Sequence, residues 1–179
     1  QSEITFPFKR FQIQNVWRAD RPQKGRYQEF TQCDADVIGS NSIILEYEML
    51  QLFSDVFRKL KLDSVNIRIN HRGVLNKIAN HIGIVEDFNE FLVIIDKIDK
   101  IGIDKAKEEV KNKFKDLRDL DELFEMISKK MSPKTYLNNL KSNFIDHDDD
   151  NLLDEIETLS KLIINDKKLI NIEFDLSLA

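Results

Sequence analysis

Residues 16–39 read VWRADRPQKGRYQEFTQCDADVIG, and this stretch decides the fold of the first part of the chain. Two runs rich in aromatic and β-branched residues, 11–19 and 26–39, lie on either side of residues 21–25, Arg-Pro-Gln-Lys-Gly. Runs of this composition favour strands, and proline and glycine between them favour a turn. The stretch therefore predicts a long β-hairpin.

The second predicted strand has two chemically different faces, because side chains alternate along a strand. One face carries Arg26, Gln28, Phe30, Gln32, Asp34 and Asp36. The other carries Tyr27, Glu29, Thr31, Cys33, Ala35 and Val37. The second set becomes apolar toward its end, so we expect it to pack on a core, with Cys33 as a buried reduced thiol. The first set offers a cation, an aromatic ring, an amide and two carboxylates, which is typical of a face that binds a ligand.

Arg18 and Asp20 share one parity on the preceding strand, and antiparallel pairing can bring them beside this polar face. Guanidinium groups bind phosphate oxygens, an aromatic ring stacks on a base, and a carboxylate accepts an amine or a ring N–H. The pattern therefore indicates a site for a nucleotide and a small cationic molecule. Alternation alone fits an exposed hairpin with ordinary charged residues equally well, and that alternative stays open at this point.

Helical spacing replaces this alternation from residue 45 onward. Apolar residues recur every three or four positions over 45–60 and again over 74–82, with a short alternating strand at 65–69 between them. Residues 85–165 show helical periodicity only, and they predict at least four helices. Ser132 before Pro133 is typical of a helix start, and Gly102 of a helix end. Residues 170–178 alternate again, which predicts a strand that pairs with the first half of the chain.

The predicted fold class is α+β. Residues 1–83 and 169–179 are expected to form part of an antiparallel sheet with flanking helices, and 84–168 an all-α insertion domain. Residues 1–83 hold 12 Lys and Arg against 9 Asp and Glu, whereas the remainder holds 15 against 23. A polyphosphate ligand is thus expected at the basic first half.

One cysteine in the chain excludes an internal disulfide and a cysteine metal cluster, which fits a reducing compartment. No apolar run approaches the length that crosses a bilayer, and residues 1–10 lack the pattern of a signal peptide. We therefore expect a soluble, cytoplasmic protein with no membrane partner.

The run at 16–39 resembles motif 2 of the class II aminoacyl-tRNA synthetases in its histidyl form. Its RPQKGRY loop and QCD tail carry the resemblance, which continues through DKIDKIG at 96–102 and FDLSLA at 174–179. The resemblance implies an internal fragment of a histidyl-tRNA synthetase, with motif 2 and the helical insertion domain. Such enzymes activate histidine with ATP to histidyl-adenylate and transfer it to tRNA(His).

The resemblance also implies a role for each residue that binds ATP. Arg18 corresponds to the motif 2 arginine, the catalytic group that grips the α-phosphate. Asp20 corresponds to the acidic residue near the adenine amino group, where the usual residue is Glu. Arg26 matches the arginine on the far phosphates, and Phe30 the ring beneath adenine.

Histidine and tRNA would be held by neighbouring positions of the same run. Gln32 falls where the family binds the amino group of histidine, and Asp36 where it binds the imidazole. Arg21 and Gln23 lie in the loop that reaches the acceptor end of tRNA. The family also implies a homodimer for the full-length enzyme. The magnesium in this reaction travels with ATP, so no protein-bound metal is expected.

Other polar features are expected to have structural roles. The acidic run Asp146–Asp150 lacks the spacing of a calcium loop and is expected to cap a helix. His71, His81 and His147 are far apart in sequence, and surface or capping roles are expected for them. We also expect that the chain alone does not activate histidine at a useful rate, because it lacks the family's other motifs.

Two further hypotheses stay open at this stage. One is a non-catalytic paralogue, either the regulatory subunit of ATP phosphoribosyltransferase or a tRNA sensor; the other is an independent helical RNA- or protein-binding module. The intact set of Arg18, Arg26, Phe30 and Gln32 favours a catalytic synthetase over the paralogue. The hairpin itself speaks against a pure binding module, which has no need of ATP-specific residue types on one face.

Overall fold

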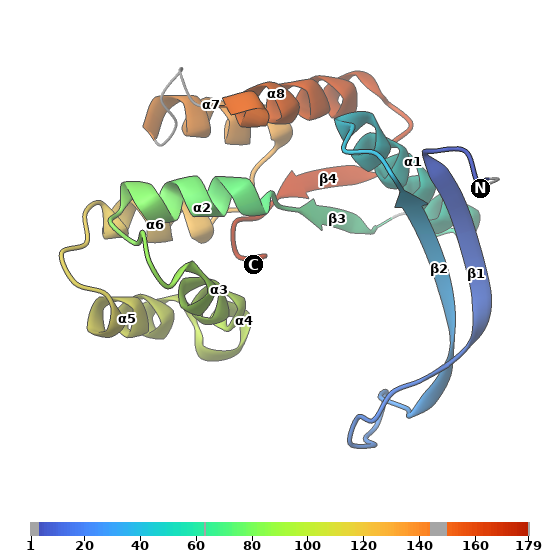
Figure 1. The fold of residues 1–179 in the computed structure, drawn as a ribbon, viewed down its shortest axis with the longest axis horizontal. Helices are drawn as coiled ribbons and strands as arrows, with labels where there is room; N and C mark the ends of the chain where they lie inside the picture. The colour runs from blue at the N-terminus through green and yellow to red at the C-terminus, as the bar shows by residue number, and fades with distance from the viewer. Residues whose placement is uncertain (1–3, 63, 144–149, 179) are drawn as a thin grey trace. The chain divides into compact units, whose positions relative to one another are not determined.

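The computed structural model describes residues 4–62, 64–143 and 150–178, which form helices and strands in the mixed order that the sequence predicts. In chain order they are β1 (Phe8–Trp17), β2 (Glu29–Ile38), α1 (Ile43–Lys59), β3 (Asn66–Ile69), α2 (Arg72–His81), α3 (Phe88–Asp96), α4 (Ile98–Ile101), α5 (Ile103–Lys113), α6 (Leu120–Ile127), α7 (Pro133–Asn143), α8 (Asp150–Asn165) and β4 (Asn171–Phe174) (Figure 1). The predicted α+β class is confirmed. The chain divides into two units, 1–45 and 46–179.

The first unit is built on the predicted hairpin. β1 and β2 pair antiparallel over their whole length, from Phe8 opposite Ile38 to Trp17 opposite Glu29. Beyond the strands, the Arg18 amide donates to the Gln28 carbonyl at 2.9 Å, so the ladder continues toward the tip. Gly25 in the tip has a φ of +79°, a left-handed conformation that glycine adopts without strain. The proline- and glycine-containing segment therefore closes the hairpin, as the sequence predicts.

The second unit holds a parallel pair of strands with the helices between them in sequence. β3 pairs with β4 in parallel, from Asn66 opposite Asn171 to Ile69 opposite Phe174. The strand that follows the helices therefore returns to the strand that precedes them, as predicted. Figure 1 shows α7 and α8 lying alongside each other, with β4 next to β3. None of the described helices combines the length and apolarity that crossing a bilayer requires.

The core of this unit is apolar and close to β4. The largest fully buried side chains come from α2, α3, α6, α7, α8 and β4, and include Phe91, Leu75, Ile78, Ile95, Leu123, Leu140 and Ile156. At its centre the ring of Tyr136 stacks on Phe174, with centroids 4.2 Å apart and planes 9° apart. The main chain of Phe174 also exchanges two hydrogen bonds with Met131, at 2.8 and 2.9 Å. β4 is thus held by strand pairing and by ring stacking together.

Helix ends follow the signals in the sequence. The Ser132 hydroxyl accepts a hydrogen bond from the Thr135 amide at 3.3 Å, at the start of α7. His71 has the predicted capping role, because its Nδ1 accepts from the Gly73 amide at 3.0 Å where α2 begins. Gly102, with a φ of +85°, separates α4 from α5. His147 and the side chains of the acidic run that ends in α8 lie outside the described residues.

The helix α1 forms as predicted, but its apolar stripe points outward. Phe53 is 47% exposed and Leu60 is 62% exposed, whereas a stripe of this kind normally faces a core. Polar side chains of α1 face the segment before β4 instead: the Tyr47 hydroxyl and the Gln51 amide donate to Asp166 at 2.7 and 2.9 Å. These bonds hold the pKa of Asp166 down to about 2, the Tyr47 bond most of all. They also set the rotation of α1 about its axis.

The predicted C-terminal strand is too long. Alternation predicts a strand over 170–178, but β4 ends at Phe174. The Asp175 carboxylate accepts hydrogen bonds from the amide and the hydroxyl of Ser177, at 3.0 and 2.6 Å, and the Leu178 amide donates to the Asp175 carbonyl at 3.2 Å. Aspartate side chains that bond to the backbone two residues ahead compete with extended structure. The chain therefore turns at Asp175.

Asp175 is also a buried charge. Its side chain is 0% exposed, and its Oδ2 lies 2.9 Å from Arg68 Nη1 and 2.8 Å from Lys130 Nζ. Burial raises the pKa of this carboxyl, but the hydrogen bonds from Lys130 and Ser177 together outweigh burial, so the pKa lies below its usual value. One carboxylate thus connects β3, the segment after α6 and the end of β4.

Replacing Asp175 by Asn should lower the free energy of unfolding by about 2 kcal/mol, because two cations lose their buried partner. This loss is smaller than for a fully buried ion pair, because both cations are partly exposed and screened by solvent. The depressed pKa means that this stabilisation is present above the unfolded-state pKa and is lost as the pH falls through the folded-state value. Urea unfolding measures both effects. Asp154→Asn, at an exposed position of α8, should change stability by less than about 0.5 kcal/mol. Equal stability of the two variants would contradict the role of Asp175.

Candidate functional site

The register of the hairpin gathers polar side chains on one face. Arg10 pairs with Asp36, and Val16 with Phe30, so even-numbered residues of both strands point to the same side. The predicted residues Arg18 and Gln32 lie on this side as well, which we call the even face. Positions two residues apart on a strand are separated by about 7 Å, so the side chains of this face form a row.

The centre of the even face is the guanidinium of Arg18. Its Cζ lies 5.0 Å from the centroid of the Phe30 ring, a distance at which a cation is attracted to the face of an aromatic ring. Its Nη2 donates to Gln32 Oε1 at 3.2 Å. The ring and the amide therefore hold one end of a cation whose other N–H groups can donate to an anion. Three of the predicted site residues meet here.

Closer to the tip, Asp20 and Arg26 form a second group. Arg26 Nε lies 3.7 Å from Asp20 Oδ2, and the Gln28 amide donates to the Asp20 carbonyl at 3.1 Å. The side chains of this ion pair are 60% and 42% exposed, so solvent screens it and either partner can turn to a ligand at little cost. Arg21 and Gln23 lie in the tip itself, where the Gln23 and Arg26 main chains exchange two hydrogen bonds.

At the opposite end of the row, two carboxylates have partners on the same face. Arg10 Nε donates to Asp36 Oδ2 at 2.7 Å, and the Gln32 amide donates to Asp34 Oδ1. The sequence reasoning assigned no role to Arg10 or Gln28, and none to Asp34 beyond its place on the face. The signal that would have found Arg10 is the register, which places it directly across from Asp36.

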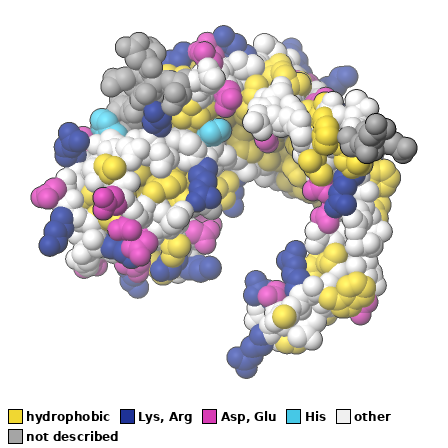
Figure 2. All heavy atoms as spheres, in the orientation of Figure 1, with side chains coloured by type: hydrophobic (Ala, Val, Ile, Leu, Met, Phe, Trp, Pro, Cys, Tyr) yellow, Lys and Arg dark blue, Asp and Glu magenta, His cyan; other side chains and the backbone are white. Residues whose placement is uncertain are grey.

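The other face of the hairpin carries apolar side chains that are exposed, contrary to expectation. Phe11 is 79% exposed and Trp17 71%, and Cys33 is exposed as well, so the predicted buried thiol is wrong. The physical reason is that the described hairpin is a sheet of two strands, so it has no second layer of its own to bury these side chains. Figure 2 shows hydrophobic side chains at the surface of the hairpin.

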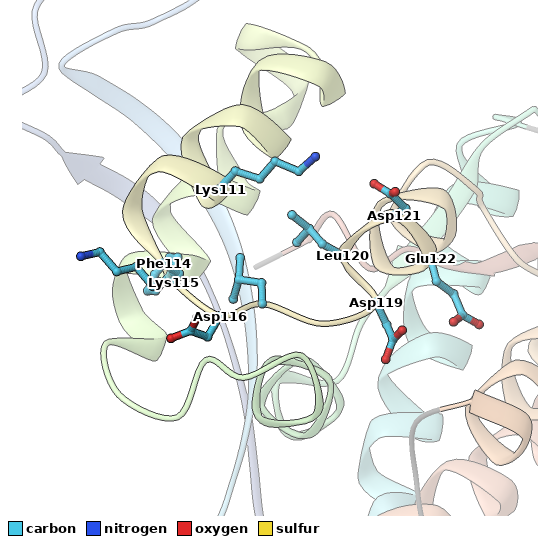
Figure 3. Close-up of a pocket in the computed structure, with 9 residues that line it drawn as sticks. Lys111, Phe114, Lys115, Asp116, Asp119, Leu120, Asp121 and Glu122 are labelled. Carbon is cyan, nitrogen blue, oxygen red and sulfur yellow. The ribbon is translucent and has the colours of Figure 1, made fainter.

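A second candidate site is a depression of about 820 Å³ between α5 and α6. Figure 3 shows Lys111 at its α5 side and Asp119 and Glu122 at its α6 side. At its rim, Asp121 already bonds to Lys107 at 2.5 Å, which lowers the pKa of that carboxyl. The depression has no cation stacked on an aromatic ring, as Arg18 is on Phe30 of the even face, among the contacts of the described residues. Within the described ranges, no three His, Cys, Asp or Glu side chains converge as a metal site requires.

Comparison with known proteins shows the family of the chain. Residues 7–179 match the family model described as histidyl-tRNA synthetase. The chain belongs to the histidyl-tRNA synthetase family. It is 43% identical, over its full length, to the histidine–tRNA ligase of Azobacteroides pseudotrichonymphae, and 57% identical, over 63% of its length, to that of Christiangramia forsetii. The even face carries the run whose sequence resembles motif 2 of this family, and it is the candidate site that we favour.

The fold agrees with this family. The crystal structure of histidyl-tRNA synthetase from Nostoc sp. PCC 7120 matches 98% of the chain with a TM-score of 0.77 and 25% sequence identity. The chain spans 39% of the length of the Azobacteroides relative, 25% of the Christiangramia relative and 41% of the Nostoc chain. These three relatives are thus considerably longer than the chain.

Cys33 should react in the folded protein. A water-soluble maleimide is expected to label one thiol per chain without denaturant, at a rate within about tenfold of the rate in denaturant, because the thiol is exposed on the hairpin. A buried thiol would react only after unfolding, at a rate at least roughly a thousand-fold lower than the rate in denaturant. Mass spectrometry measures the labelling, and Cys33→Ser should take up no label. Protection of the thiol in the folded chain would show that another surface covers this face.

Proposed function

We propose that the chain forms the ATP- and histidine-binding face of a histidine–tRNA ligase, which activates histidine with ATP and transfers it from histidyl-adenylate to tRNA(His). The observation that carries the proposal is the placement of Arg18 between the Phe30 ring and the Gln32 amide, in a chain that belongs to the histidyl-tRNA synthetase family. A guanidinium fixed in advance stabilises charge that develops at a reacting phosphate.

Arg18 is the catalytic residue of this proposal. It grips the α-phosphate of ATP, where negative charge builds as the histidine carboxylate attacks. Phe30 lies beneath adenine, Arg26 binds the far phosphates and Asp20 lies near the adenine amino group. The exposed pairing of Asp20 with Arg26 supports these last two roles, because both side chains can exchange partners when the nucleotide binds.

Histidine is held through Gln32 at its amino group and through Asp36 at its imidazole. In this arrangement Arg10 is the cation that Asp36 exchanges for the substrate, since the two side chains pair at 2.7 Å and both are 44% exposed. A carboxylate is already a nucleophile, so the reaction needs no general base. Magnesium enters with ATP as part of the substrate complex and not as a protein-bound metal.

The other partners in this proposal are tRNA and a second subunit. Arg21 and Gln23 in the exposed tip reach the acceptor end of tRNA(His), and the full-length enzyme acts as a homodimer in the cytoplasm. Residues 1–83 and 169–179 form part of the catalytic core, and 84–168 form the insertion domain. The alternative of a non-catalytic paralogue is not favoured, because the relatives at 43% and 57% identity are named as ligases.

In the natural full-length protein, Arg18→Ala should lower the rate of histidine-dependent pyrophosphate exchange by roughly 100- to 1,000-fold, because the α-phosphate loses a preorganised donor. Steady-state exchange kinetics measure this effect. Thr31→Val, on the opposite face of the hairpin, is the control and should exchange at the unmutated rate. Exchange that survives Arg18→Ala unchanged would refute the catalytic role.

Arg21→Ala should separate the two half-reactions of the full-length protein. We expect exchange within twofold of the unmutated rate, because that step does not involve tRNA, and aminoacylation about tenfold slower, because the tip loses a charged contact to the acceptor end. Parallel measurements of pyrophosphate exchange and of histidine transfer to tRNA test this expectation. Equal losses in both assays would place Arg21 in the activation step instead.

A further inference from the structure

Gln32 lies between two opposite charges on the even face. Its Oε1 accepts from Arg18 Nη2 at 3.2 Å, and its Nε2 donates to Asp34 Oδ1. A guanidinium has donors only, and an ionised carboxylate has acceptors only. Only one orientation of the carboxamide can therefore satisfy both neighbours, with oxygen toward Arg18 and nitrogen toward Asp34. The flipped amide would lose both bonds, because its N–H groups would point at the donors of Arg18 and its oxygen at the carboxylate of Asp34.

We propose that Asp34 is a positioning residue for the amino acid substrate: it holds the Gln32 carboxamide with its oxygen toward Arg18, where that oxygen receives the substrate's ammonium group. The role rests on the proposed function, in which Gln32 binds the amino group of histidine. A carbonyl oxygen has two lone pairs, so Oε1 can accept from the ammonium while it keeps its bond to Arg18.

The neighbouring carboxylate is placed for a different task. Asp36 Oδ2 is paired with Arg10 Nε at 2.7 Å, whereas Asp34 bonds to Gln32 on the same strand. Asp34 therefore acts through an amide and Asp36 offers its charge to a cation. The two acids of the row, which look equivalent in the sequence, differ in what they contact.

The Asp34→Asn substitution isolates the charge. An asparagine oxygen can still accept from Gln32 Nε2, but its amide nitrogen can equally donate to Gln32 Oε1 in the flipped state, so Asp34 no longer selects the orientation and only Arg18 still favours it. A hydrogen bond to a charged group contributes more to stability than a neutral one, and the difference corresponds to roughly tenfold in binding. The expected effect is thus confined to the affinity for the amino acid.

The test uses histidine-dependent pyrophosphate exchange by the natural full-length protein. Asp34→Asn should raise the KM for histidine about tenfold, with less than a twofold change in the KM for ATP and an unchanged melting temperature. Asp34→Glu, which keeps the carboxylate, should recover part of the loss. The matched control is Glu29→Gln: Glu29 accepts from the Asn15 amide at 3.0 Å on the opposite face of the hairpin, and its neutralisation should leave both KM values unchanged.

A double-mutant cycle shows whether Asp34 acts through Gln32. In the Gln32→Ala background, Asp34→Asn should have no further effect on the KM for histidine. Two results would overturn the positioning role while leaving the proposed function intact. One is a full effect of about tenfold from Asp34→Asn on the KM for histidine in the Gln32→Ala background. The other is no effect of Asp34→Asn on that KM when Gln32 is present and the protein is active. Absence of exchange in the unmutated protein would overturn the proposed function, and this role with it.

Discussion

The antiparallel register of β1 and β2 is the constraint on which the candidate site depends. With Val16 opposite Phe30 and Arg10 opposite Asp36, the predicted site residues of the hairpin strands point to one side. A slip of one residue between the strands would move one strand's set to the opposite face and separate Arg18 from Phe30. The tip, closed by Gly25, holds this register at one end.

The contacts on the even face have a common logic. The charged groups of this face have partners in the unliganded protein, but these partners either are exposed or leave some hydrogen-bond donors of the charged group available. Arg18 has N–H groups beyond the one that it gives to Gln32, and Asp36 is paired with an exposed cation. An unliganded site of this kind keeps its charges satisfied and ordered at the same time, so that little reorganisation is needed when substrates bind.

Features that depend on local pattern were predictable from the sequence. Alternation predicted the hairpin and the membership of each face, three- and four-residue spacing predicted the helices, and Ser132 and His71 lie at helix starts as expected. The roles of the site residues came from the resemblance to a family and stay proposals, because geometry shows which residues meet and not what they bind.

Features that depend on distant partners were not predictable in this way. The outward rotation of α1 follows from bonds between Tyr47 and Asp166, which are far apart in the sequence. The early end of β4 follows from the Asp175 carboxylate, which accepts a hydrogen bond from the backbone two residues ahead and pairs with two cations from other segments. The exposed Cys33 face shows the limit most clearly, since alternation predicts that a face is apolar but not which surface covers it.

The parallel pairing of β3 with β4 has a consequence for how the family can vary. Because Asn66 lies opposite Asn171 and Ile69 opposite Phe174, the long helical segment leaves the strand pair at one end, after Ile69, and returns at the other end, before Asn171. A segment anchored in this way can gain, lose or exchange helices while the strand register stays fixed, since loop length adds little to the cost of closure. Its internal attachment to β4 runs through Lys130 and Met131, so the stretch between α6 and α7 is where such variation would meet resistance.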